Sequence, residues 1–474
     1  MGKQKYKSLK VFLNRHLRLS KGRICGIVAA VTISLSLLQF SAKQTYFRKS
    51  RGPPPTFQVQ PKYGSYAKVP EKSRRTYYVD THTKYKATAI RALRNIGWRR
   101  TNDYETAQLI WDKTMDSEYF PELKAWQRYN HIPGVESWDD KDNFIEGFEQ
   151  YLRKNPEKKF MMLPETYKIS TQQGIKDWRK RLFQHSGMDI PWVLKQTDVN
   201  NGEGIDILGP NSKELKDVEQ DLDHQNATED GTYVVQAYIC NELTWWGNFK
   251  FDLRYYWLVA SLDPLIVLYH DGFVRVGNSA YSESDFSSTT KHLTTHTYLP
   301  DEIKAPADDL ARLIRQHYQK NYRKLSKTIK IDPYEHVRNQ LKEAVAETVA
   351  AFKHVTFRTD TKDGKFTAEN GFVIYGIDFV LDNDLNAWYT ESQEGPGWEE
   401  EFDFRITLHK DLLESAFRIV EEIQNKVESD PSANVLPLEN QAGWDIVYAG
   451  NGEHHWMYNY SGYNRPTKAN NCKR

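Results

Sequence analysis

The stretch Lys250-Phe251-Asp252-Leu253-Arg254 places three charged side chains alternately with two apolar ones. Successive side chains of a strand point to opposite faces, so the three charged residues share one face and the apolar pair shares the other. Charges of both signs on one sheet face suit a pocket for phosphate and carboxylate groups. A solvated sheet face with cross-strand ion pairs gives the same pattern and remains the alternative. Arg275, which follows Asp271-Gly272-Phe273-Val274, would add another positive group to such a pocket.

A second group of polar residues lies further along the chain, where two strands joined by a hairpin turn are predicted within residues 372–390. Asp378, Glu391 and Gln393 fall where these adjacent strands bring their side chains together. Three oxygen donors with room for phosphate oxygens suit Mg²⁺. Surface acids are also common at strand ends, so a solvated turn explains this group equally well.

Upstream, the predicted strand Trp192-Val193-Leu194 ends on Lys195, and the Gly-containing loop 200–205 follows it. Such a lysine can reach nucleotide phosphates while loop amides cover them, although most lysines in this setting belong to ordinary hairpins. The strand from Tyr233 to Ile239 carries Gln236, whose amide could bind the edge of an adenine ring.

The remaining elements follow from hydrophobic periodicity. A long amphipathic helix is predicted around Val337–Phe352, and a last helix over Leu408–Val427. Nearer the N-terminus, strands are predicted at 77–79 and 109–111, and a helix at 87–96.

Taken in order, these motifs resemble the tubulin-tyrosine-ligase-like family over roughly residues 76–415. The segment 130–134, the pair Lys141-Asp142 and the run 160–167 resemble the same family. The resemblance implies a mixed α/β (α+β) ATP-grasp fold, in which two lobes hold ATP behind an N-terminal α/β domain. It also implies an ATP-dependent carboxylate–amine ligase that forms an amide bond through an acyl phosphate.

By this likeness, each candidate residue takes a role in the expected site. The residues expected to bind ATP are Lys141, Lys195, Gln236, Tyr238, Ile239 and Lys250. The residues expected to face the substrates are Asp252, Arg254, Arg275 and Thr294. The residues expected to hold Mg²⁺ are Asp378, Glu391 and Gln393.

Three positions depart from the family pattern. Gln393 stands where the family usually has Asn, Thr295 follows His292-Leu293-Thr294 where Asn is usual, and Gln196 replaces a Pro after Lys195. These departures put turnover in question more than fold. The alternative is therefore a weak or inactive ATP-grasp module that acts by binding.

Composition restricts the function classes. The 474 residues carry a net charge of +2, so the chain has no strong overall positive potential of the kind that favours nucleic-acid binding. Three scattered cysteines, Cys25, Cys240 and Cys472, form neither a disulfide framework nor a zinc motif, and unpaired thiols are expected.

Residues 24–42 are uncharged and rich in apolar side chains. As a helix they would be about 28 Å long, close to the thickness of a bilayer core, and we expect an uncleaved membrane anchor. Eight Lys and Arg residues precede this segment and five follow it (Lys43, Arg48, Lys49, Arg51 and Lys62). This bias favours a type II protein with a lumenal body, in the endomembrane system or Golgi, and the sequon Asn226-Ala227-Thr228 fits that side. A body facing the cytosol remains the alternative.

The expected organisation has six parts. They are a basic tail 1–23, a transmembrane helix 24–42, a Pro-containing stem 43–75, an N-terminal and linker domain 76–190, an ATP-grasp domain 191–428 and a C-terminal extension 429–474. An anchor followed by a stem is also typical of lumenal transferases, which often bind metal with Asp-x-Asp. The triplet Asp382-Asn383-Asp384 has that form, but it lies where the hairpin turn is expected.

Overall fold

The computed structural model describes most of the chain beyond residue 58. The described residues are 59–61, 67–80, 86–112, 123–132, 141–156, 163–184, 187–197, 202–222, 233–294, 303–353, 371–399 and 402–450. The chain divides into units 1–57 and 58–474, and every described residue belongs to the second. The expected tail, membrane helix and most of the stem therefore lie outside the described residues. Within the described part, no helix is long and apolar enough to span a bilayer.

The first sheet is parallel, with strand order β2-β1-β3-β4. Its strands are β1 (Thr76–Val79), β2 (Arg99–Arg100), β3 (Leu109–Trp111) and β4 (Arg128–Tyr129). Helix α3 (Lys86–Asn95) joins β1 to β2. It buries Ala89, Ala92 and Leu93 on one face, at the spacing i, i+3, i+4 that is typical of an amphipathic helix. The helix and strands expected in this region are confirmed.

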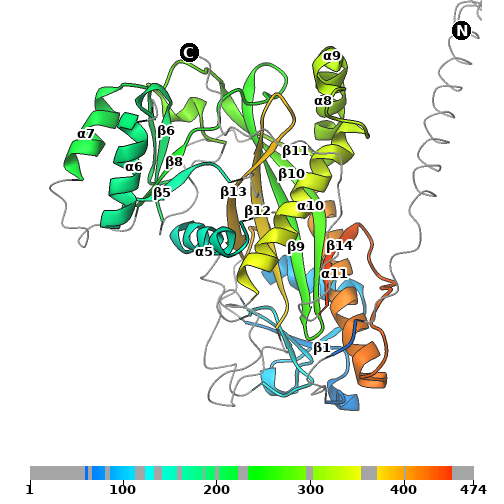
Figure 1. Cartoon of the computed structure of the whole chain (residues 1–474). Helices are drawn as coiled ribbons and strands as arrows, with labels where there is room; N and C mark the ends of the chain where they lie inside the picture. Colours follow the sequence, from blue (N-terminus) through cyan, green and yellow to red (C-terminus); the bar gives the residue numbers. More distant parts are fainter. Residues whose placement is uncertain are drawn as a thin grey trace, which may run out of the picture. The chain divides into compact units, whose positions relative to one another are not determined.

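The second sheet is antiparallel, with order β5-β8-β6-β7. Its strands are β5 (Thr166–Lys168), β6 (Trp192–Gln196), β7 (Ile205–Leu208) and β8 (Tyr233–Ala237). Helices α6 (Gln172–Gln184) and α7 (Lys213–Asp221) cover it (Figure 1). The ring of Trp178 on α6 meets Trp192 edge-on at 6.1 Å, and both are fully buried. Because β5 pairs with β8, this small lobe begins before the domain boundary expected at residue 190.

The third sheet has order β11-β10-β9-β12-β13, and β14 pairs with β10. Its strands are β9 (Phe249–Leu262), β10 (Leu265–Ala280), β11 (Ile303–Pro306), β12 (Val373–Leu381), β13 (Ala387–Glu394) and β14 (Trp444–Ala449). Strand β14 comes from the segment expected as a separate extension, so part of that segment belongs to this sheet. The sequence of β14 is too short to show a clear alternation of apolar and polar side chains, so no strand was predicted there.

Helices lie on both faces of this large sheet. They are α5 (Lys141–Lys154), α8 (Ala307–Lys320), α9 (Tyr322–Leu325), α10 (Pro333–Phe352) and α11 (Asp403–Ser429). The connections of the three sheets also contain the 3-10 turns η1 (Glu71–Ser73), η2 (Tyr104–Thr106), η4 (Gly187–Asp189) and η5 (Thr289–Lys291). Helix α10 crosses the sheet (Figure 1) and buries Val337 and Leu341 in the same apolar cluster as Trp257. The adjacent Tyr256 points to the other face, where its hydroxyl meets His409 of α11 at 3.1 Å. The mixed α/β class is confirmed, and α11 begins five residues before the expected helix.

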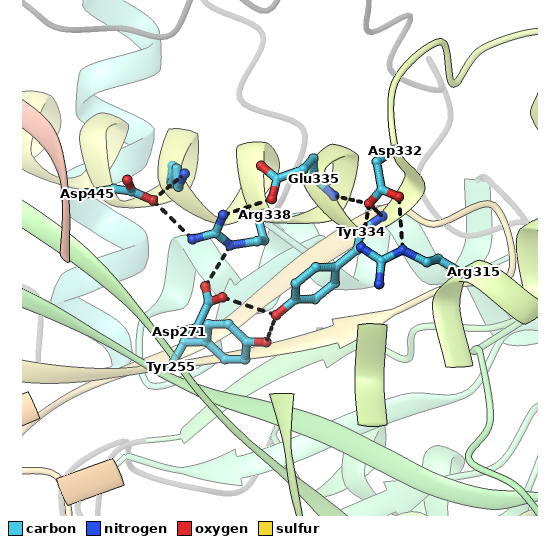
Figure 2. A network of polar contacts seen from close by, with 9 residues as sticks. Tyr255, Asp271, Arg315, Asp332, Tyr334, Glu335, Arg338 and Asp445 are labelled. Atoms are coloured by element: carbon cyan, nitrogen blue, oxygen red, sulfur yellow. Dashed lines mark hydrogen bonds and ion pairs between the residues drawn. The ribbon is translucent and has the colours of Figure 1, made fainter. Parts of the chain in front are cut away.

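A polar network lies on the α10 face (Figure 2). Arg338 of α10 donates to Asp271 of β10 at 2.9 Å and to Asp445 of β14 at 3.0 Å. Tyr334 donates to the second oxygen of Asp271 at 3.2 Å, and its hydroxyl meets that of Tyr255. Arg338 thus links β14 to α10, on the face of the sheet opposite to Asp252 and Arg254.

The glycine at 272 allows close approach of two strands. The register of β10 against β9 shifts between His270 and Phe273, and a Cβ on Gly272 would overlap with the backbone carbonyl of Arg254. We expect Gly272→Ala to lower the free energy of unfolding by about 1–3 kcal/mol, the usual cost of overpacking. Chemical denaturation of the full chain measures the change. Gly209→Ala is the control, because its Cβ would meet only Phe286 at 3.4 Å. Equal stability of the two variants would contradict the argument.

Candidate active site

Four charged residues from three neighbouring strands form a buried cluster. Arg254 of β9 donates to both oxygens of Asp378 on β12, at 2.5 and 3.0 Å. Arg275 of β10 donates to both oxygens of Asp252, at 2.7 and 2.8 Å, and also to Asp378 at 2.6 Å. Each of the four residues is at most 9% exposed. The alternation predicted for residues 250–254 is confirmed, and the ion pairs cross between strands in a buried setting.

The guanidinium groups control the ionisation of Asp378. Burial raises the pKa of this carboxyl group, but the charges and hydrogen bonds of Arg254 and Arg275 outweigh burial and lower the pKa to about 2. Thr294 donates to Asp252 at 2.5 Å, so the four residues expected on the substrate side lie together. The cluster pairs two arginines with two aspartates, so a carboxylate substrate would have to compete with Asp252 and Asp378 for the arginines.

A pocket lies beside this cluster. Its lining combines two lysines and an acid with amide, hydroxyl and apolar groups, namely Lys141, Phe144, Ile145, Thr166, Lys195, Val234, Gln236, Thr390, Glu391 and Ser392. Lys195 donates to the amide oxygen of Gln236 at 2.8 Å, and Lys141 meets Glu391 at 3.3 Å. Burial lowers the pKa of Lys195 to about 8. A partly apolar pocket that contains two lysine ammonium groups suits a nucleotide with its polyphosphate.

A comparison with family models decides the relationship. The model described as "Tubulin-tyrosine ligase family" matches residues 115–429. The chain belongs to this family. The match spans the small lobe and the large sheet except β14, so it covers every residue of the pocket and the charged cluster.

Curated relatives agree with this assignment. Tubulin polyglutamylase TTLL7 of Xenopus tropicalis is 26% identical over 76% of this chain and 38% of its own length. Tubulin polyglutamylase TTLL6 of Homo sapiens is 24% identical over 74% of this chain and 37% of its own length. The probable tubulin polyglutamylase ttll-9 of Caenorhabditis elegans is 25% identical over 58% of this chain. The chain therefore spans about two fifths of the length of the first two relatives.

The residues expected to hold adenine are divided in the structure of this family member. Gln236 lines the pocket and donates from its amide nitrogen to Thr166 at 2.9 Å. Tyr238 and Ile239 lie beyond the pocket lining. The Tyr238 amide donates to the Pro191 carbonyl at 3.0 Å, and Ile239 packs against Val380 and Trp388. The structure brings together Lys141, Lys195, Gln236 and Glu391, while Lys250 pairs with Glu242 nearby.

The residues expected to hold Mg²⁺ lie on facing strands. Asp378 pairs in register with Glu391, and the amide oxygen of Gln393 accepts from Arg254 at 3.0 Å. Among the described residues, no group of three or more acidic, His or Cys side chains could hold a metal ion. Two carboxylates with an amide have the donor chemistry that suits Mg²⁺, which is usually bound by one or two carboxylates plus substrate phosphates. Their oxygens are paired here with Arg254, Arg275 and Lys141, so a bound ion would have to displace those partners.

Several site residues were missed from the sequence. Thr166, Phe144 and Ile145 line the pocket, and Glu242 holds Lys250. Thr166 belongs to a segment that carried the family resemblance, and Phe144 lies on the apolar face of an amphipathic helix, so both had a usable pattern. Glu242 had none, because the sequence does not indicate which side of a loop faces a neighbouring strand.

The Asp-x-Asp triplet forms a turn, as predicted. Asp382 accepts from the backbone amides of Asp384 and Asn386, both at 2.9 Å, and from the Trp388 indole at 3.1 Å. Its carboxylate is thus committed to the β12–β13 hairpin. This use of the oxygens opposes the metal-binding transferase alternative.

One expectation about cysteine is wrong. Cys240, which follows Ile239 between the small lobe and β9, is disulfide-bonded. The other two cysteines of the chain lie outside the described residues. Spacing in the sequence could not reveal this bond, because pairing depends on segments that are distant along the chain.

Proposed function

We propose that this protein is an ATP-dependent carboxylate–amine ligase. The observation that carries the proposal is the position of Lys141 and Lys195 in one pocket, bordered by Glu391, next to the buried Arg254–Asp378 and Arg275–Asp252 pairs. Cations for a polyphosphate and arginines for a carboxylate then flank a single reaction centre.

In the proposed reaction, an acceptor carboxylate oxygen attacks the γ-phosphorus of ATP, which gives an acyl phosphate and ADP. The donor amine then attacks the acyl carbon, phosphate leaves, the amine loses a proton and an amide remains. Lys141 and Lys195 would hold the phosphates, and their charge would offset the negative charge on the transferring group. Arg254 and Arg275 would orient carboxylates by their planar pairs of donors.

Asp378, Glu391 and Gln393 would hold Mg²⁺ in this proposal. When bound, the ion supplies positive charge to the phosphate oxygens. Asp378 suits this role because its neighbouring arginines keep it ionised, as the lowered pKa of about 2 indicates.

For the substrates, we propose an amino acid as the amine donor and a carboxylate of a protein or peptide as the acceptor. The support is the named activity of the relatives, tubulin polyglutamylases. Tubulin itself is a candidate acceptor only if the body of the protein faces the cytosol.

The full chain with Mg²⁺-ATP, carboxylate-rich peptides and mixtures of amino acids tests the proposed reaction. We expect one ADP for each amide-linked amino acid that is found on the peptide by mass spectrometry. A folded sample that neither binds ATP at millimolar concentration nor forms ADP would contradict the proposal.

A second candidate is a binding module without turnover. It is favoured by Gln393, whose oxygen is held by Arg254 at 3.0 Å instead of being free for a metal. Such a module would bind ATP, but the assay above would give neither ADP nor product.

We further propose that residues 24–42 anchor the protein in a membrane with its body in the lumen of the secretory pathway. The charge bias around this segment supports this topology, and so does the disulfide of Cys240, since disulfides persist in oxidising compartments. A lumenal body would require ATP to be imported and would act on proteins of the secretory pathway.

This topology predicts that Asn226, which lies outside the described residues, carries a glycan. We expect a mass decrease on endoglycosidase treatment of the full chain from eukaryotic cells, and no decrease for Asn226→Gln. In the same sample, alkylation of Cys240 should require prior reduction. Digestion of the body by protease added to sealed microsomes would contradict the lumenal topology, whatever the state of Asn226.

A further inference from the structure

A strongly basic surface lies at the corner where α8 and α9 meet. Between Asp309 and Asp332 the chain has seven Lys and Arg residues and no Asp or Glu. Six of the seven side chains are exposed, and Arg315 is partly buried. A concentration of one charge on a small surface attracts groups of the opposite charge, although the chain as a whole is nearly neutral.

These basic residues differ in whether an acid neutralises them. Three have an acidic partner, namely Arg312 with Asp309, Arg315 with Asp332, and Lys324 with Asp384. The other four make no ion pair with a described residue, namely Lys320, Arg323, Lys327 and Lys330. The corner therefore keeps an excess of positive charge that faces solvent.

The packing beneath the corner holds its backbone in place. Leu325 of α9 and Ile329 of the turn after it are at most 2% exposed, and both belong to the apolar cluster under α10. Nε2 of His317 on α8 lies 2.8 Å from the carbonyl oxygen of Asn383, in the turn between β12 and β13. The basic side chains thus project from a fixed support.

The spacing of the unpaired charges fits an acidic polypeptide. The amides of Ser326 and Ile329 bond to carbonyls four residues earlier, so helical geometry continues past α9. Arg323 and Lys327 are four residues apart, which places them about 5–6 Å from each other on one side of a helix. Carboxylates on one side of an extended acidic segment recur about every 6–7 Å. The two series can therefore pair over several residues.

A membrane surface fits this corner less well. Helices that bind at a lipid surface bury a broad apolar face in it, whereas Leu325 and Ile329 are turned into the protein. Tyr322 is 55% exposed, and the ring of the half-exposed Trp246 is covered by the guanidinium of Arg312 at 4.8 Å. This is too little apolar surface for insertion into lipid.

The corner is separate from the candidate active site. Helix α8 packs against α10 (Figure 1), and its Leu310 and Ile314 join Trp257 in the apolar cluster on that face of the sheet. Arg254 points to the opposite face. A partner on the α8–α9 corner therefore does not compete for the arginines of the charged cluster.

We propose that the α8–α9 corner is a docking surface for an acidic segment of a partner protein. Arg323 and Lys327 form its centre, and Lys320 and Lys330 extend it on either side. This inference goes beyond the proposed ligase reaction, since docking requires neither ATP nor a residue of the pocket. Because the charges are exposed, salt should weaken the interaction.

The test is binding of a fluorescently labelled poly-L-glutamate peptide to the full chain in micelles of a non-ionic detergent, without ATP, followed by anisotropy. We expect saturable binding that weakens as salt rises, and no binding of a poly-L-glutamine peptide. In the double variant Arg323→Glu/Lys327→Glu we expect affinity to fall about tenfold or more, because each reversal replaces an attraction with a repulsion.

The matched control is Arg99→Glu/Arg100→Glu. Both residues are exposed on strand β2 of the first sheet, and the double variant changes the net charge by the same amount. We expect it to bind the peptide within about twofold of the wild type. Thermal unfolding of both double variants checks that they are folded.

Equal weakening in the two double variants would overturn the proposal, because only net charge would then matter. Unchanged affinity in Arg323→Glu/Lys327→Glu would do the same. Displacement of the peptide by phosphatidylserine added to the micelles, but not by phosphatidylcholine, would assign the corner to a membrane instead. If the reversed variant does not fold, Arg323→Gln/Lys327→Gln replaces it, with an expected loss of about threefold. Since ATP is absent, none of these results depends on the proposed ligase reaction.

Discussion

Asp378→Ala is expected to destroy ligase activity and to destabilise the fold. Asp378 accepts three hydrogen bonds from Arg254 and Arg275, which are buried on neighbouring strands. Its loss leaves two buried guanidinium groups short of a counter-charge, which costs about 3–5 kcal/mol of folding stability. Since the same carboxylate is proposed to hold Mg²⁺, turnover should fall about 10³-fold or more in the fraction that stays folded.

Two variants separate these effects. Asp378→Asn keeps the size and one acceptor, so it should fold better than the alanine variant and still lack activity. Asp445→Ala removes a comparable partner of Arg338 on the opposite face, and it should lower the unfolding free energy with near-normal turnover per folded molecule. Chemical denaturation and the rate of ADP formation are the measurements. Normal turnover in Asp378→Asn would refute a role for this carboxylate in the reaction.

Lys195→Met is expected to weaken ATP binding by about 10–100-fold, the range for loss of a charged hydrogen bond. Lys195 lines the pocket, and among the described residues its ammonium makes one side-chain hydrogen bond, to Gln236 at 2.8 Å, so its removal disturbs little of the fold. Burial lowers the pKa of its ammonium to about 8, compared with 10.5 in its ordinary setting.

The lowered pKa predicts a particular pH dependence. As pH rises through about 8, free Lys195 loses its proton, whereas bound phosphates favour the charged form. ATP affinity should therefore fall as pH rises from 7 to 9.5, and binding near pH 8.5 should take up protons. Calorimetry in buffers of different ionisation enthalpy measures that uptake.

The sign for stability is the opposite of the sign for affinity. Between about pH 8 and 10.5 the unfolded chain keeps the proton that folded Lys195 has lost, so this residue makes the folded state more stable as pH rises. Lys195→Arg is the control, since its guanidinium stays charged and should give a flat profile of ATP affinity over this range. A flat profile in the wild type would contradict the assignment of Lys195.

Much of the site was predictable because the period of a strand is fixed. The alternation in Lys250–Arg254 decides which side chains share a face, whatever the strand packs against. The hairpin within 372–390 brought Asp378 opposite Glu391 for a similar reason, since a short turn restricts the register. These local rules also gave the helices around residues 90, 345 and 420.

What the sequence by itself determined, then, is the set of elements, the face on which each charged residue lies and the family to which their order belongs. The tertiary structure alone decided the partners. Arg275 reaches both Asp252 and Asp378 because bulges in β10 set its register, and Lys141 reaches the pocket from a distant helix. The tertiary structure likewise determined that Glu242 pairs with Lys250 and that β14 lies beside β10. The physical reason is that side-chain direction follows from the local backbone, whereas register and docking follow from packing the whole core at once.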